Sequence, residues 1–273
     1  MPYIFDGRPL IRDAFERQYT IPAFNICSAE MLRACIEAAE AERAPVIVQT
    51  YPADIAQVDV HHMYALVKSY ADRASVPVML HMDHGEDIAM DLRCLRAGYS
   101  SVMLDGANSS LDEVLEQTNT LADICHTSQA SLEVAAESFN HGMAEFTKPA
   151  DALAIKEAGA DMIAISVGSE HGQSGVLQRQ LMAEIANTTQ HPLVLHGGSG
   201  ISAEDYAFAR TCGVVKANIG SALYRTLRGV WQDSADAPNH RAVYARVREA
   251  LVPVARRYLV MMDASDKAPK ISP

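Results

Sequence analysis

Three histidines, His84, His171 and His196, each stand directly before a glycine and just after a short apolar run typical of a β-strand. One such histidine alone would most simply be a strand-end residue. Three neutral imidazoles that converge from separate strands suit a divalent metal with an open coordination position. The following glycine lets the backbone turn away and leaves room for a ligand. The matched positions therefore predict a metal site.

An acid lies beside the first of these histidines, because Asp83 directly precedes His84. A carboxylate this close to a metal ligand can orient that ligand or act as a general acid or base. His81 shares a strand face with Asp83, and we expect it to be a structural residue inside the fold. Glu86 and Asp87 follow the strand, where acids more often stabilise a helix N-terminus.

Two glycine- and serine-containing segments follow the last two apolar runs. The first contains Gly197 and Ser199, and the second contains Asn218, Gly220 and Ser221. Backbone N–H groups in such turns, next to a helix N-terminus, bind phosphate in many α/β barrels. A single glycine-rich turn is a weak signal, but two consecutive ones predict a phosphate site.

Eight short β-rich runs alternate with helix-like segments. The predicted strands are residues 21–25, 46–50, 76–83, 101–105, 131–136, 162–167, 193–196 and 214–219. The predicted helices between them are residues 28–43, 60–73, 88–97, 111–126, 149–158, 178–188 and 202–211. Most of the predicted strands consist almost entirely of apolar residues, as is typical of parallel strands covered on both faces.

This alternation predicts an α/β fold, a single (β/α)8 TIM barrel spanning residues 1–273. An open doubly wound sheet is the competing fold, but its dinucleotide-binding version lacks the expected GxGxxG motif after the first strand. Residues 5–19 are expected to form an N-terminal helix under the barrel. The tail after Val243 is expected to be helical and then to fray over residues 263–273.

The composition narrows the class of function. The chain has 273 residues, with 23 Lys+Arg against 34 Asp+Glu and a net charge of −11, so we expect neither nucleic-acid nor membrane partners. No apolar run approaches the roughly 20 residues that cross a bilayer, and no signal peptide is evident. Five scattered cysteines are typical of reduced thiols, which predicts a cytoplasmic protein.

Seven segments between residues 21 and 225 resemble the class II, metal-dependent fructose-bisphosphate and tagatose-bisphosphate aldolase family. They are IPAFNI, PVIVQ, VPVMLHMDHGED, RAGYSSVMLDGANSSLDE, GADMIAISVGSEHG, PLVLHGGSGIS and VVKANIGSAL. Their order and spacing, with the motifs DHG, SEHG and LHGGSG, make the resemblance specific.

The resemblance implies a ligand set and a division of roles. His84, His171 and His196 would hold one Zn²⁺ per chain, and Asp83 would exchange a proton with the hydroxyl at the new carbon–carbon bond. The phosphate of dihydroxyacetone phosphate would be bound by Gly172, Gly197, Ser199 and Ser221, with Asn218 beside the enediolate. We further expect substrate contacts from Asn25 and Gly220, a monovalent cation near the phosphate site, and a homodimer or homotetramer.

The chain also departs from the family pattern. Of the usual Glu-Ala-Glu after the fifth strand, only the last residue matches, as Glu137. This residue is expected either to hydrogen-bond a metal ligand or to bind the metal itself. The family's mobile loop is short here, with Glu145 and His141 as candidates for the second acid/base and Glu145 the one we favour. Tyr51 replaces a serine that contacts the distal phosphate. We therefore expect tagatose 1,6-bisphosphate or a C6-modified ketose 1-phosphate as substrate, with the glycolytic fructose 1,6-bisphosphate as the alternative.

Other readings stay open at the sequence level. Tyr51 could point outward, with an arginine such as Arg256 or Arg257 from this or a neighbouring chain binding a distal phosphate. A Schiff-base aldolase would need a strand-end lysine, for which Lys216 is the one candidate in the predicted strands. A metal-dependent sugar-phosphate isomerase or epimerase would use a similar site. A non-catalytic aldolase-like subunit would be expected to lack metal ligands that this chain retains.

Overall fold

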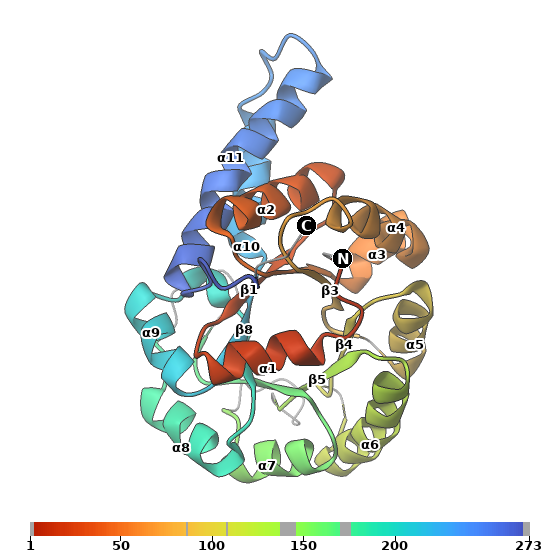
Figure 1. The fold of residues 1–273 in the computed structure, drawn as a ribbon, viewed down its shortest axis with the longest axis vertical. Coiled ribbons are helices and arrows are strands. Elements are labelled where there is room, and N and C mark those ends of the chain that lie inside the picture. The colour runs from red at the N-terminus through yellow and green to blue at the C-terminus, as the bar shows by residue number, and fades with distance from the viewer. Residues whose placement is uncertain (1–2, 86, 108, 137–145, 170–175, 270–273) are drawn as a thin grey trace.

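A computed structural model describes residues 3–85, 87–107, 109–136, 146–169 and 176–269, and their strands form one closed parallel barrel in the order β1 to β8 (Figure 1). The strands are β1 Ile21–Asn25, β2 Val46–Thr50, β3 Val78–Met82, β4 Ser101–Leu104, β5 Ser131–Ala135, β6 Met162–Ile165, β7 Leu193–Leu195 and β8 Val214–Ile219. The barrel predicted from the alternating pattern is confirmed, and each strand lies within one of the predicted runs.

Helices surround the barrel as the alternating pattern predicts (Figure 1). They are α1 Arg8–Glu16, α2 Ala29–Glu42, α3 Pro52–Val58, α4 Val60–Ala71, α5 Ile88–Ala97, α6 Leu111–Thr127, α7 Pro149–Glu157, α8 Arg179–Thr189, the short 3-10 turn η1 Gly198–Gly200, α9 Ala203–Thr211, α10 Ser221–Gln232 and α11 His240–Met261. Two of the α-helices, α3 and α10, were not predicted. Both begin directly at a loop that lines the cavity described below.

Several helix starts follow from local hydrogen bonding. The side chains of Ser28, Asp87 and Ser202 accept hydrogen bonds from backbone N–H groups three residues later. Ser110 and Glu113 form a reciprocal capping box at the start of α6. Such caps satisfy N–H groups that the first helical turn leaves unpaired, which fixes where the chain leaves each loop.

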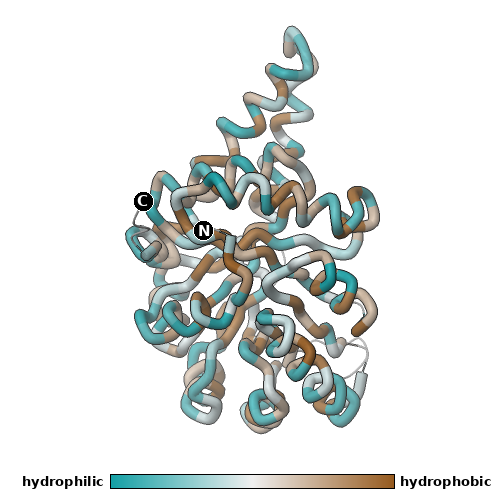
Figure 2. Tube along the Cα trace, turned by 45° about the vertical axis from the view of Figure 1, so that its right-hand side comes forward, coloured by the Kyte–Doolittle hydropathy of each residue, from teal (hydrophilic) through white to brown (hydrophobic). Residues whose placement is uncertain are grey.

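Several polar side chains are buried inside the barrel. Gln49, His81, Glu133 and Lys216 come from four different strands and are all fully buried. Apolar side chains cover the outer face of the barrel and pack against the helices, so brown segments concentrate on the strands and teal ones on the outer helical surface (Figure 2). Buried polar groups of this kind need partners, and these groups connect directly to the site.

The C-terminal helices leave the barrel as an arm. In Figure 1, α10 and α11 extend beyond the ring of helices, and α11 lies against α2. The chain then returns to the barrel, where the N–H groups of Asp266 and Ala268 donate to the carbonyls of Glu42 and Arg43, at 2.9 and 3.0 Å. The predicted fraying is therefore wrong for this part of the tail, because backbone hydrogen bonds tie it to the end of α2.

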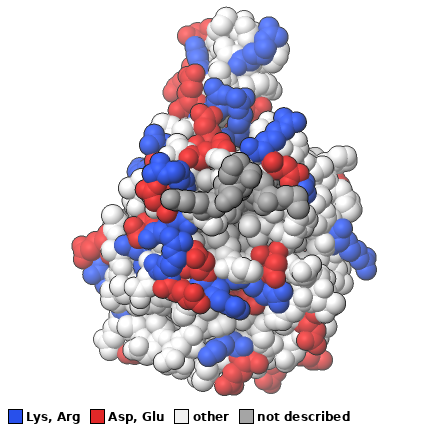
Figure 3. Space-filling view, viewed as in Figure 1, with Lys and Arg blue, Asp and Glu red and all other residues white. Residues whose placement is uncertain are grey.

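The surface carries charges of both signs. Acidic and basic side chains are interspersed over the face that carries α1, without a continuous basic area on that side (Figure 3). Within the described ranges, no helix is both long enough and apolar enough to cross a bilayer.

Candidate active site

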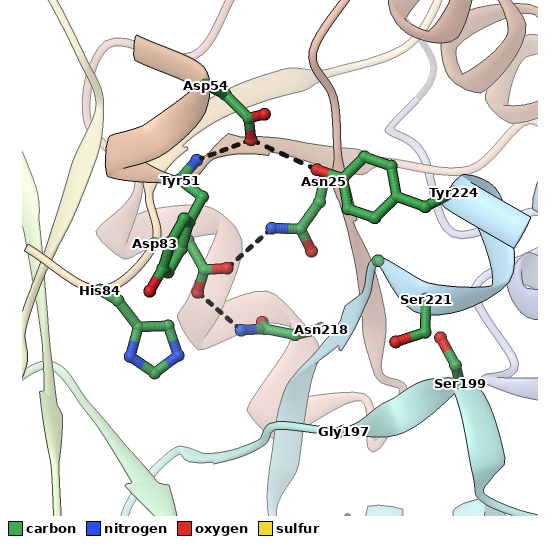
Figure 4. Close-up of a pocket in the computed structure, with 11 residues that line it drawn as sticks. Asn25, Tyr51, Asp54, Asp83, His84, Gly197, Ser199, Asn218, Ser221 and Tyr224 are labelled. Carbon is green, nitrogen blue, oxygen red and sulfur yellow. Dashed lines mark hydrogen bonds between the residues drawn. The ribbon is translucent and has the colours of Figure 1, made fainter. Parts of the chain in front are cut away.

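A cavity of about 430 Å³ opens where the carboxyl ends of the strands meet the following loops (Figure 4). Its described lining residues are Asn25, Tyr51, Asp54, Asp83, His84, Gly197, Ser199, Asn218, Gly220, Ser221 and Tyr224. This is the end of a (β/α)8 barrel where chemistry is normally found. Eight of the site residues predicted from the sequence therefore line one cavity, together with Tyr51, the residue at which the sequence departs from the family pattern.

Asp83 is held by amide groups from three strands. Its Oδ2 accepts hydrogen bonds from Asn25 Nδ2 at 2.8 Å and Gln49 Nε2 at 2.9 Å. Its Oδ1 accepts one from Asn218 Nδ2 at 2.8 Å (Figure 4). Three donors favour the ionised carboxylate and fix its plane. Gln49 was missed at the sequence level, although a glutamine in an otherwise apolar strand was a visible signal.

The charge state of Asp83 follows from its surroundings. Burial raises the pKa of Asp83, but the positive charge of Lys216 and the nearby histidines lower it more strongly, so the pKa lies below its ordinary value. Asp83 is only 4% exposed. The site therefore presents a fixed, ionised carboxylate that can accept a proton from a bound ligand.

His84 stands in a turn that few side chains adopt. Its φ is +59°, in the left-handed region. Its Nδ1 lies 2.8 Å from Oδ2 of Asp105, at the end of the neighbouring strand β4. A carboxylate partner on one ring nitrogen makes Nε2 the nitrogen that can bind a metal. Asp105 was not identified from the sequence as a site residue.

A carboxylate orients His196 in the same way. Its Nε2 lies 3.0 Å from Oε1 of Glu133, so Nδ1 is the nitrogen that can bind a metal. The rings of His84 and His196 have their centres 4.8 Å apart. One ligand atom from each of Asp83, His84 and His196 lies within 4.8 Å of the others. These donors fit a divalent metal of the zinc class.

Glu133 and Lys216 form a buried ion pair beneath the cavity. Lys216 Nζ lies 2.9 Å from Oε2 of Glu133, and both side chains are fully buried. Burial raises the pKa of Glu133, whereas Lys216 and the hydrogen bond from His196 hold it well below its ordinary value. Burial also lowers the pKa of His81 to about 3, so His81 is a neutral structural residue, as expected. Lys216 does not line the cavity, which disfavours a Schiff-base role.

The predicted phosphate loops meet at one side of the cavity. Gly197 adopts a φ of +67°, which a glycine accommodates without strain. Ser199 Oγ accepts a hydrogen bond from the N–H of Ala222 in the first turn of α10, at 3.2 Å. Tyr258 of α11 donates to the carbonyl of Ser199 at 2.9 Å. The loop therefore lies against the positive end of a 12-residue helix, which favours an anion.

A different set of residues forms the other side of the cavity. The ring of Tyr51 lies edge-on to that of His84, with centres 5.9 Å apart, and the residue is 45% exposed. Asp54, from the first turn of α3, lies behind it, and its Oδ2 accepts long hydrogen bonds from the Tyr224 hydroxyl and the Tyr51 N–H. Burial raises the pKa of Asp54, and the charge of Asp83 adds to this effect. The sequence reasoning missed Asp54 and Tyr224.

Neither arginine considered for a distal phosphate lines this cavity. Arg256 pairs with Glu42 at 2.7 Å, and Arg257 stacks on Tyr258. Six residues named from the sequence, Glu86, Glu137, His141, Glu145, His171 and Gly172, lie outside the described residues, so the predictions made for them remain predictions.

Comparison with known proteins agrees with the geometry. The family model for class II fructose-bisphosphate aldolase matches residues 6–267. The crystal structure of the YdjI aldolase from Escherichia coli K12 is 26% identical, with a TM-score of 0.88 over 98% of this chain and 100% of that one. A fructose-bisphosphate aldolase from Campylobacter jejuni, 21% identical, shares the fold with a TM-score of 0.82 over 97% of this chain and 96% of that one. This chain therefore belongs to the class II fructose-bisphosphate aldolase family.

Proposed function

We propose that this protein is a metal-dependent aldolase that reversibly cleaves a ketose phosphate to dihydroxyacetone phosphate and an aldehyde. The observation that carries the proposal is the carboxylate of Asp83, fixed by three amide donors. It lies beside two histidines whose other ring nitrogens contact Asp105 and Glu133. An aldol cleavage requires a base, metal ligands and a place for the phosphate, and candidates for all three lie close together at this end of the barrel.

The metal is proposed to be one Zn²⁺ per chain, held by His84, His171 and His196. When bound there, it supplies Lewis-acid stabilisation of the negative charge left on the ketone fragment. Glu133 and Asp105 set the orientation of two of these imidazoles. A ligating histidine that is held in this way loses little freedom on metal binding.

The proton steps are proposed to start at Asp83. Its carboxylate takes the proton of the C4 hydroxyl, the C3–C4 bond breaks, and C4 becomes the carbonyl carbon of the released aldehyde. The bonding electrons pass to C3 of the ketone fragment, and a second group then protonates C3. Glu145 remains our candidate for that group. Asn25 and Asn218 keep the Asp83 oxygens aimed at the hydroxyl, because their amides donate to both of them.

The ketone phosphate is proposed to bind at the loops after β7 and β8. Gly197, Ser199, Gly220 and Ser221 line this side of the cavity, with Gly172 as a further predicted contact and a monovalent cation expected nearby. The positive end of α10 favours a phosphate at this loop, so a basic side chain is not needed there. Replacement of Ser199 by alanine should therefore raise KM for the ketose phosphate more than it lowers kcat.

We propose that tagatose 1,6-bisphosphate or a C6-modified ketose 1-phosphate is the substrate rather than fructose 1,6-bisphosphate. The support is Tyr51, which lines the cavity instead of pointing away from it. A cleavage screen of ketose 1-phosphates and 1,6-bisphosphates, each with and without a chelator, tests the proposed function. Chelator-sensitive release of dihydroxyacetone phosphate supports it. Isomerisation without cleavage, or cleavage that survives complete metal removal, contradicts it.

The wider setting is also a proposal. Five free cysteines, four of them buried, fit a reducing compartment, and we place the protein in the cytoplasm. The net charge of −11 supports a small-molecule substrate without nucleic-acid or membrane partners. We also propose a homodimer or homotetramer, which light scattering coupled to size-exclusion chromatography can measure.

A further inference from the structure

The two sides of the cavity differ in chemistry. Ser199 and Ser221 lie on one side and Tyr51 and Asp54 on the opposite side, with Asn25 drawn between them (Figure 4). If the ketone phosphate occupies the serine side and Asp83 removes the C4 proton, carbons beyond C4 must extend toward Tyr51 and Asp54. This side therefore contacts the half of the sugar that becomes the aldehyde.

This aldehyde side is acidic and aromatic. Among the described lining residues there is no lysine or arginine, while Asp54 and Asp83 both carry carboxyl groups. Both hydrogen bonds that Asp54 accepts, at 3.3 Å from Tyr224 and 3.4 Å from Tyr51, are long and end on the same oxygen, Oδ2. Neither donor is charged, so neither neutralises the carboxylate.

A terminal phosphate fits such a surface poorly. A phosphate monoester carries a charge of about −1.5 to −2 at neutral pH and offers mainly acceptor oxygens. A carboxylate is likewise an acceptor, so the two groups repel and cannot pair. A sugar hydroxyl has the opposite character, because it donates to a carboxylate and also accepts from a phenol such as that of Tyr224.

We propose that Asp54, together with Tyr51 and Tyr224, selects ketose 1-phosphates whose far end is uncharged and hydroxylated, and rejects the corresponding 1,6-bisphosphates. The inference rests on the proposed aldol cleavage and narrows its substrate class: of the two candidates proposed above, it retains the C6-modified ketose 1-phosphate and excludes tagatose 1,6-bisphosphate. Asp54 is the specificity-determining residue, since it places a negative charge where a second phosphate would lie.

The test compares pairs of substrates that differ only at C6. The values of kcat/KM are measured for fructose and tagatose 1-phosphates and for their 1,6-bisphosphates, with the metal-loaded wild-type enzyme. We expect each 1-phosphate to be preferred by about tenfold or more, because like charges placed together in a binding site are strongly unfavourable. An equal or higher value for the bisphosphates overturns the inference.

Variants then assign the selection to Asp54. Asp54→Asn keeps the shape and an acceptor for the Tyr51 N–H but removes the charge, so it should shift the ratio toward the bisphosphate by about tenfold, mostly through KM. Asp54→Ser serves as a second, smaller helix-capping variant if the first folds poorly. Asp59→Asn is the matched control, because Asp59 is an exposed acid that caps the next helix and does not line the cavity.

The outcomes separate this inference from the proposed function. Cleavage with an unchanged ratio in Asp54→Asn overturns the role of Asp54 and leaves the aldolase assignment standing. Absence of cleavage for all four sugars, with metal bound and the protein folded, contradicts the proposed function and the inference with it. A ratio that moves equally in Asp59→Asn also overturns the inference, since the effect would then follow overall charge.

Discussion

Lys216 determines which way the side chain of Asn218 faces. Its Nζ donates to Oδ1 of Asn218 at 2.6 Å, and an ammonium group cannot accept a hydrogen bond in return. The amide oxygen of Asn218 must therefore face Lys216, and its Nδ2 must face Asp83, to which it donates at 2.8 Å. The buried ammonium group of Lys216 thus makes the amide of Asn218 a hydrogen-bond donor to Asp83, the candidate base.

Lys216→Met should destabilise the fold by about 3–5 kcal/mol, because it leaves the buried carboxylate of Glu133 without its cation. Urea denaturation followed by circular dichroism measures this loss. The double variant Lys216→Met/Glu133→Gln should recover part of the stability, since the uncompensated charge is gone. A double variant no more stable than the single one would show that the pair is not the source of the effect.

His84→Ala and His196→Ala should each lose the bound metal and the cleavage activity, because their donor atoms lie within 4.8 Å of one another. The measurement is metal content per chain by elemental analysis, with activity assayed in parallel. His61→Ala is a suitable control, since His61 lies on the exposed face of α4 and outside the cavity. Wild-type metal content in either site variant would remove that histidine from the proposed ligand set.

Asp83→Ala should keep the metal and slow cleavage by about 10²–10⁴. Exchange of the C3 proton of dihydroxyacetone phosphate with solvent should be affected much less, because that step does not involve the C4 hydroxyl. Isotope exchange followed by NMR separates the two reactions. Equal loss of exchange and cleavage would instead make Asp83 a support for the site, and loss of metal would make it a ligand.

The buried carboxyl group of Asp91 should make the stability of the fold depend on pH, independently of the chemistry of the active site. It is fully buried in α5, and neither carboxyl oxygen has a hydrogen-bond partner within the described residues. Burial, with a smaller contribution from Asp87, raises its pKa well above the ordinary value. The folded state then holds a proton that the unfolded chain releases near pH 4. Stability should consequently fall as the pH rises from about 4 toward the folded-state pKa.

Asp91→Asn should flatten this part of the curve, because the amide does not titrate. Urea midpoints between pH 4 and 8 measure the slope. Asp112→Asn, a change of an exposed acid in the first turn of α6, should leave it in place. An identical slope in wild type and Asp91→Asn would exclude Asp91 as its source.

Local patterns were enough to predict the barrel and much of its active end. Apolar runs that alternate with capped helices fix the order of the strands, and parallel strands place their carboxyl ends together. The positions of Asp83, His84 and His196 at strand ends were therefore enough to predict that they lie close together. The helix α10 was missed because its start lies in the glycine- and serine-containing loop, which was interpreted as a phosphate loop only.

The partners of these residues were decided by the tertiary structure. Gln49, Asp105 and Glu133 contact residues 34, 21 and 63 positions away, through hydrogen bonds between different strands or the residues that directly follow them. The sequence shows that a polar residue stands in a strand, but the stagger of the closed barrel decides which residue it meets. The same holds for Asp54, whose sequence context did not predict the helix α3 that carries it. Asp54 meets Tyr224, 170 residues away, only because the barrel closes and α10 begins beside the cavity. Sharing a cavity is a property of the assembled fold and not of either segment.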